Sequence, residues 1–138
     1  MIAILATAFA MFAEPTLGTL PAQALPRTGC AAYLWSPSDR RFVGMAEPGR
    51  LRIVLDGKPA DLAAASATGT AGLGLAATTV YRLDTTTVTL DLTVEPRADL
   101  TGGALVSAAT LRLAREGQDE LVAPLAGLVG CAPERAGS

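Results

Sequence analysis

The sequence contains neither histidine nor asparagine among its 138 residues, and only 4% of its residues are aromatic. Without histidine, no imidazole is available as a general base, as a member of a catalytic triad or as a zinc or copper ligand. Without asparagine, the chain has no N-glycosylation acceptor. The net charge of −2 provides no basic surplus that would attract nucleic acid or an acidic membrane surface. Much of common catalysis is therefore excluded, and we expect no nucleic-acid partner.

The length and the apolar content together indicate one folded domain. Half of the residues are hydrophobic, which is too many for a disordered chain. No apolar run reaches the roughly 18–20 residues that a membrane-spanning helix needs. We therefore expect no membrane span in the mature chain.

The N-terminal residues have the pattern of a secretory signal peptide. Residues 2–13 form an apolar run of the length found in the hydrophobic part of such signals. Ala22 and Ala24 then form a small-x-small pattern, which predicts cleavage after Ala24. The chain would accordingly divide into a signal peptide, residues 1–24, and one mature domain, residues 25–138.

Two features leave alternatives to this interpretation. No lysine or arginine precedes the apolar run, although secretory signals carry such charges, so a translation start upstream of Met1 stays open. A buried N-terminal helix is the other alternative, which Pro15 and Pro21 disfavour because proline interrupts a helix.

Two cysteines, Cys30 and Cys131, lie near the two ends of the mature domain. An even pair in an exported chain favours a disulfide over two unrelated buried thiols, which is the alternative. Such a bond would close a loop of about 100 residues and contribute about 4–5 kcal/mol of stability. Together with the signal pattern, the pair predicts a periplasmic or extracellular protein.

Alternation of apolar and polar residues dominates the mature chain and predicts β-strands. In residues 87–95 the side chains of Val88, Leu90, Leu92 and Val94 lie on one face. Residues 60–67 fit a helix or a strand, and alanines in residues 104–115 leave a helix as an alternative there. Pro124 limits the last strand to a sheet edge or a bulge, because proline cannot donate a ladder hydrogen bond. The expected strands are residues 30–35, 41–46, 50–56, 73–83, 87–95, 105–114 and 121–131.

Turn residues separate these strands at short intervals. Asp56 and Gly57 begin a turn with the preferred residue types, and Asp84 begins a tight hairpin. About seven to eight short strands joined by such turns predict an all-β fold. The expected architecture is a single antiparallel β-sandwich or small barrel.

The residues that remain for chemistry do not assemble a recognisable active site. Asp91 and Glu95 share a strand face, but about 13 Å separates them at about 3.3 Å per residue, too far for paired carboxylate catalysis. No serine lies in a nucleophile elbow, and the acidic residues do not have calcium-loop spacing. We therefore expect no enzyme activity, no metal and no cofactor, with a small carboxylate-dependent hydrolase as a remote alternative.

One group of residues is typical of a binding surface. Tyr33 and Trp35 share the face of their strand opposite Ala32, and Arg40 and Arg41 follow in the next loop. Aromatic and arginine side chains are enriched in binding hot spots. The alternative is that Trp35 packs in the core.

The segments Gly29-Cys30-Ala31-Ala32-Tyr33-Leu34-Trp35 and Gly127-Leu128-Val129-Gly130-Cys131 resemble those of small uncharacterised exported proteins of alphaproteobacteria. This resemblance implies a periplasmic location and carries no activity. We accordingly expect an exported, non-catalytic accessory or binding module of the cell envelope, with an envelope protein as partner. The main alternative is a structural or assembly component that pairs with a partner through an edge strand.

Overall fold

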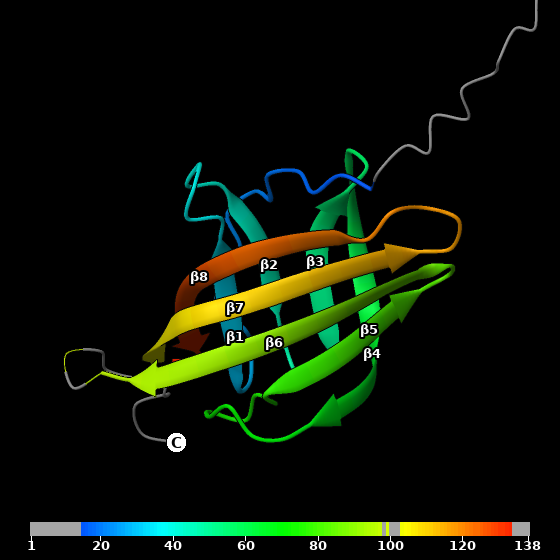
Figure 1. Cartoon of the computed structure of the whole chain (residues 1–138). Helices are drawn as coiled ribbons and strands as arrows, with labels where there is room; N and C mark the ends of the chain where they lie inside the picture. Colours follow the sequence, from blue (N-terminus) through cyan, green and yellow to red (C-terminus); the bar gives the residue numbers. More distant parts are fainter. Residues whose placement is uncertain (1–14, 98, 100–102, 134–138) are drawn as a thin grey trace, which may run out of the picture.

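Eight antiparallel strands follow one another along the chain and close into a barrel (Figure 1). The computed structural model describes residues 15–97, 99 and 103–133. Each strand pairs with its neighbours in the chain, and the last strand pairs with the first. In chain order the strands are β1 (Cys30–Trp35), β2 (Phe42–Ala46), β3 (Arg50–Leu55), β4 (Lys58–Thr68), β5 (Thr78–Leu83), β6 (Thr86–Pro96), β7 (Gly103–Arg115) and β8 (Leu121–Cys131).

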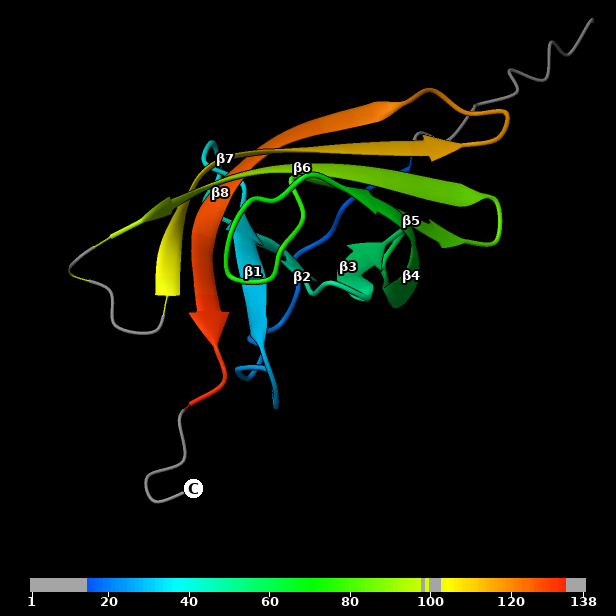
Figure 2. The ribbon, with the colours of Figure 1, turned by 90° about the horizontal axis from the view of Figure 1, so that it is seen from below.

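The all-β prediction is confirmed, and of the two expected architectures the structure has the barrel rather than the sandwich. Figure 2 shows the long strands β6 and β7 on one side of the ring and β1 to β4 on the other. Residues 60–67 lie in β4 and residues 104–115 lie in β7, so the helix considered for each is wrong. In both segments, pairing with two neighbouring strands outweighs the helix propensity of alanine.

The predicted turns join neighbouring strands. Asp56 and Gly57 connect β3 to β4 with φ angles of 50° and 83°, the two positive values of a type I′ hairpin. Asp84, with φ 52°, begins the hairpin between β5 and β6, in which Leu83 pairs with Thr86. Both connections therefore match the turn chemistry of the sequence.

The inward side chains fill the barrel. An eight-stranded barrel has an interior just wide enough for side chains, and here Leu, Ile and Val residues occupy it. Tyr81 adds a polar group, and its hydroxyl donates a hydrogen bond of 2.9 Å to the carbonyl oxygen of Glu47. Burial raises the pKa of Tyr81 to about 12. The largest buried aliphatic side chains are Leu34, Leu51, Ile53, Leu62, Leu90, Leu111 and Leu113.

One predicted strand begins later than its sequence pattern suggested. The pattern placed residues 73–83 in a strand, but β5 begins at Thr78. Leu73 lies in a turn with φ 54° and is 45% exposed, between two glycines that also have positive φ. Leu75 is buried as expected. Leu75 thus keeps the inward position that the apolar spacing predicted, whereas Gly72 and Gly74 take the backbone at Leu73 out of the sheet.

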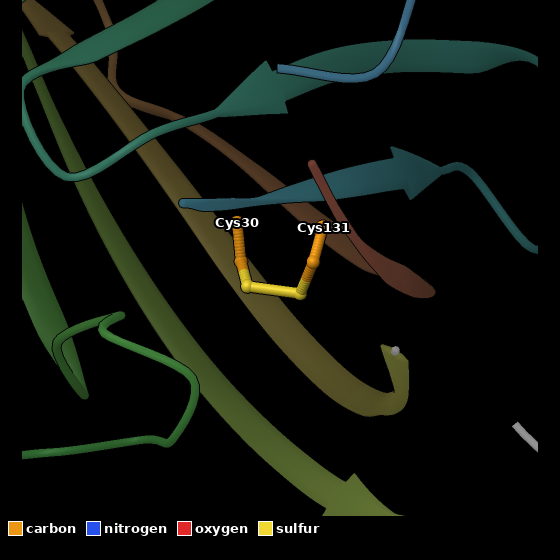
Figure 3. The surroundings of a disulfide bond; sticks show 2 residues. All are labelled: Cys30 and Cys131. Atoms are coloured by element: carbon orange, nitrogen blue, oxygen red, sulfur yellow. A yellow bond between two sulfur atoms is a disulfide. The ribbon is translucent and has the colours of Figure 1, made fainter. Parts of the chain in front are cut away.

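The barrel closes between β1 and β8, and a disulfide bond crosses this seam. Cys30 begins β1, Cys131 ends β8, and the two are register partners with Cα atoms 4.0 Å apart (Figure 3). The predicted disulfide is thus confirmed. Pro124 lies in residues 121–125 of β8, which pair with β7 but not with β1, so the proline lies where β8 has a free edge, as its residue type predicted.

A segment without regular secondary structure precedes β1 and packs on the outside of the barrel. We call residues 15–24 the strap. In Figure 1 it is the blue trace that crosses the ends of β3 and β2 before the chain turns into β1. Leu17 forms a β-bridge with Leu55 at the end of β3. The strap coincides with the described part of the predicted signal peptide; residues 1–14 lie outside the described residues.

Candidate functional site

Tyr33 and Trp35 lie on the outer wall of β1, as their alternation predicted. The intervening residue, Leu34, points into the barrel and is fully buried, as is Ala32. Tyr33 pairs in register with Met45 of β2 and with Leu128 of β8. The two aromatic side chains therefore mark one face of the barrel, centred on β1.

Tyr33 is covered, however, and is only 8% exposed. Its ring belongs to an outer apolar cluster with Leu20, Met45 and Val54. Its hydroxyl donates a hydrogen bond of 2.8 Å to the carbonyl oxygen of Ala24. Burial raises the pKa of Tyr33, and the negative charge of Glu47 adds to the shift. Tyr33 thus anchors the strap and leaves little surface for a ligand.

Trp35 is the accessible aromatic of the pair, with 37% of its surface exposed. It packs against Phe42 of β2, with ring centroids 4.7 Å apart and planes tilted by 34°. The sequence analysis missed Phe42, because its register with Trp35 depends on an irregularity between Leu34 and Trp35. A shallow groove of about 290 Å³ runs beside the two rings and is bounded by Leu20, Ala22, Gln23, Tyr33, Trp35 and Phe42.

Exposed apolar surface continues from these rings onto β8. Leu128 is 44% exposed on the same wall, across the seam from Tyr33. We call Trp35, Phe42 and Leu128 the aromatic face. Large apolar side chains gathered on one wall are typical of contact surfaces.

The two predicted arginines have different environments. Arg41 forms an ion pair with Asp39 at 2.6 Å and donates a hydrogen bond of 3.0 Å to the carbonyl oxygen of Leu17. It therefore holds the strap. Arg40 lies exposed in the β1–β2 loop with φ 57°, its backbone amide donating to the carbonyl oxygen of Ser36. Both side chains reach solvent, since the Arg41 side chain is 41% exposed, but Arg41 is held by its two contacts.

A second groove, of about 600 Å³, lies between residues 23–30 and the β2–β3 connection. Its charged wall includes Glu47, Arg50 and Arg52. Arg50 pairs with Glu47 at 3.2 Å, and Arg52 pairs with Asp61 at 2.8 Å. The Arg52 hydrogen bond holds the pKa of the Asp61 carboxyl below its usual value. The guanidinium groups of Arg50 and Arg52 are thus paired with carboxylates, whereas Arg27, which also lines the groove, forms no ion pair with the described residues.

The carboxylates of the described residues are used mainly in structural contacts. Asp91 accepts a hydrogen bond of 2.6 Å from Thr78, and Asp56 pairs with Arg115 at 2.6 Å. Within the described ranges, no group of three or more acidic or cysteine side chains is placed to hold a metal ion. The arrangement provides an apolar contact surface rather than an assembled set of acid and base groups.

Comparisons with family models, with curated proteins and with solved structures found no match to this chain. The resemblance to alphaproteobacterial exported proteins therefore stays a prediction. Among the described residues, no helix has the length and apolarity needed to cross a membrane. This finding and the disulfide are compatible with a periplasmic or extracellular protein.

Proposed function

We propose that this chain is an exported, non-catalytic binding module of the cell envelope, and that it contacts a protein partner through the aromatic face. The observation that carries the proposal is the pair of Trp35 and Phe42 on the outer wall, where Trp35 stays 37% exposed although it packs on Phe42. A large aromatic anchor with an arginine nearby is the usual centre of a protein contact.

The disulfide supports the export part of the proposal. Disulfides persist in oxidising compartments such as the periplasm and the extracellular space, and they are rare in the cytosol. The bond joins Cys30 and Cys131 across the seam that closes the barrel. A protein whose barrel seam is cross-linked by an oxidised pair is suited to function outside the cytosol.

A protein partner fits the shape of the surface better than a small molecule does. The groove beside Trp35 is shallow, and its volume of about 290 Å³ is at the lower limit of pockets that enclose small ligands. The barrel interior is filled by side chains. A partner would therefore lie on the wall rather than enter the barrel.

The competing functions have less support. Edge-strand pairing needs a free strand edge. Each strand has a neighbour on both sides in the ring, and the free edge at residues 121–125 of β8 is short and contains Pro124, which cannot donate a ladder hydrogen bond. A carboxylate-dependent hydrolase needs two acids close together. Asp39, Asp56 and Asp61 are each bound to an arginine, and Asp91 and Glu95 lie four residues apart along β6, about 13 Å at about 3.3 Å per residue.

The proposal is tested by capturing partners of the tagged protein from crosslinked envelope extract, with mass spectrometry as the readout. We compare the unmodified protein with Trp35→Ala and with Leu83→Ala. Leu83 is a matched control because it is 38% exposed and lies on β5, four strands away around the ring. Circular dichroism and the oxidised disulfide verify that each variant is folded.

We expect one stoichiometric protein partner, which is lost with Trp35→Ala and kept with Leu83→Ala. Equal capture by the two variants would refute the aromatic face as the contact surface. Recovery of the unmodified protein alone would refute the binding function itself.

A further inference from the structure

The main chain of the strap is hydrogen-bonded to two strands of the barrel, β2 and β3. β2 and β3 are paired only as far as Gly44 and Ile53, and beyond this point the strap occupies the gap between them. Its main-chain bonds go to both strands, from Thr16 and Gly18 to the β3 side and from Leu20 to β2. The bonds are Asp56 N–H to Thr16 O at 3.0 Å, Gly18 N–H to Val54 O at 2.9 Å and Leu20 N–H to Phe42 O at 2.8 Å.

The strap also supplies part of the apolar packing. Leu20 is 2% exposed and completes the outer cluster with Tyr33, Met45 and Val54. Pro15, at the other end of the strap, is fully buried. Without Leu20, the apolar side chains beneath it would face water.

Side chains of the barrel hold the strap along its length. Arg41 donates to the carbonyl oxygen of Leu17 at 3.0 Å, and Arg52 donates to the side chain of Gln23 at 2.8 Å. The hydroxyl of Tyr33 donates to the carbonyl oxygen of Ala24. If residues 15–24 were removed, the donors on Arg41, Arg52 and Tyr33 would lose these acceptors and bond to water instead.

We infer that residues 15–24 are a permanent part of the folded protein, and that any cut by signal peptidase lies before Pro15 rather than after Ala24. Cleavage after Ala24 would remove a built element and uncover the cluster around Tyr33. A signal peptide is ordinarily discarded without consequence for the fold, whereas this segment is hydrogen-bonded to the barrel and buries Pro15 and Leu20.

A second cleavage pattern precedes the strap, inside the apolar run of residues 2–13. Its use would require the upstream translation start considered above, because a secretory signal has about 15–30 residues. Ala8, Phe9 and Ala10 form a second small-x-small triplet, which lies outside the described residues. A cut after Ala10 would leave the whole strap in the mature chain. Cleavage by signal peptidase requires the export that the proposed function includes, whereas the permanence of the strap does not depend on export.

The test is the N-terminus of the exported protein. The full chain with a C-terminal tag is produced in a bacterium, the cells are fractionated, and the protein is characterised by intact mass and N-terminal sequencing. A variant with Ala24→Leu serves as the matched control, because a bulky residue at this position blocks a cut after residue 24. The Ala24 side chain is exposed, so the barrel can accept leucine there.

We expect the unmodified chain and Ala24→Leu to share one N-terminus at or before Pro15. An N-terminus beyond Pro15, such as Leu25, would overturn the inference, and so would a failure of processing in Ala24→Leu alone. An uncut chain in the cytoplasm would contradict export alone. The strap is then tested by the free energy of unfolding of Leu20→Ala, and a value equal to that of the unmodified protein would overturn the permanent strap, so that the two proposals fail separately.

Discussion

Loss of the disulfide should destabilise the barrel by several kcal/mol, and the size of the effect follows from the length of the closed loop. Cys30 and Cys131 are 101 residues apart in sequence. Removing a cross-link over such a loop restores conformational entropy to the unfolded chain, which corresponds to about 4.7 kcal/mol at room temperature in the chain-entropy model. A domain of this size has a total free energy of unfolding of about 5–15 kcal/mol. The double variant Cys30→Ala/Cys131→Ala should therefore lose between a third and nearly all of its stability.

Urea unfolding followed by circular dichroism measures the loss. With a denaturant dependence of about 1–3 kcal/mol/M, the midpoint should fall by about 2–5 M. The unmodified protein in excess reductant should unfold near the midpoint of the double variant, and reductant should not move the variant. A loss below about 1 kcal/mol would refute the argument, since the seam between β1 and β8 would then hold without the cross-link.

Three further outcomes follow from other contacts. Gly127→Ala should lower the free energy of unfolding by a few kcal/mol in urea, because a Cβ atom there would overlap the Tyr33 carbonyl oxygen across the seam. Gly49→Ala is its control, since a Cβ atom at Gly49 meets nothing within 4 Å. Equal stability of the two variants would contradict the close approach at Gly127. Leu20→Ala should cost about 2–5 kcal/mol if the strap is part of the domain, and a loss below about 1 kcal/mol would contradict its packing role. The hydrogen bond from the Thr16 backbone amide, together with Arg115, lowers the pKa of Asp56. The ionised Asp56 carboxylate therefore stabilises the fold above its unfolded pKa of about 3.9. This stabilisation is lost as the pH falls through the lower pKa of the folded state. Asp56→Asn should accordingly lose less stability between neutral pH and about pH 3 than the unmodified protein does, and identical pH profiles would exclude the contribution.

The strands could be predicted from the sequence because each depends on local alternation. Val88, Leu90 and Leu92 are buried along β6 as their spacing required. Hairpin connections were equally predictable, since Asp-Gly at 56–57 adopts the backbone that its residue types favour. Strand alternation and turn chemistry are local properties, so neither depends on residues far away in the sequence.

The choice between a sandwich and a barrel could not be made in the same way. Alternation shows which face of a strand is buried, but it does not show which distant strand lies beside it. Closure depends on β1 pairing with β8, and their cysteines are 101 residues apart. The cysteine pair predicted that the ends meet, yet a bridge between two facing sheets would have met the same condition.

The candidate site was predictable in part for the same reason. Alternation placed Tyr33 and Trp35 on one face, but it gave no sign that the strap covers Tyr33. The strap has no periodic pattern, and the small-x-small pattern of Ala22 and Ala24 predicted that it belongs to a signal peptide. The register irregularity that brings Phe42 beside Trp35 is set by the packing of the two strands and not by either strand alone.

The disulfide gives the ring a property that an open sheet lacks. Seven of the eight junctions between neighbouring strands are closed by a covalent connection along the chain, and the eighth is closed by sulfur. All eight junctions are therefore covalently closed, and the ring has no preferred beginning. A circular permutant opened between Gly117 and Gln118, with the natural ends joined by a linker, would keep every strand pairing of the original. In such a chain the order of synthesis would change while the barrel stayed the same.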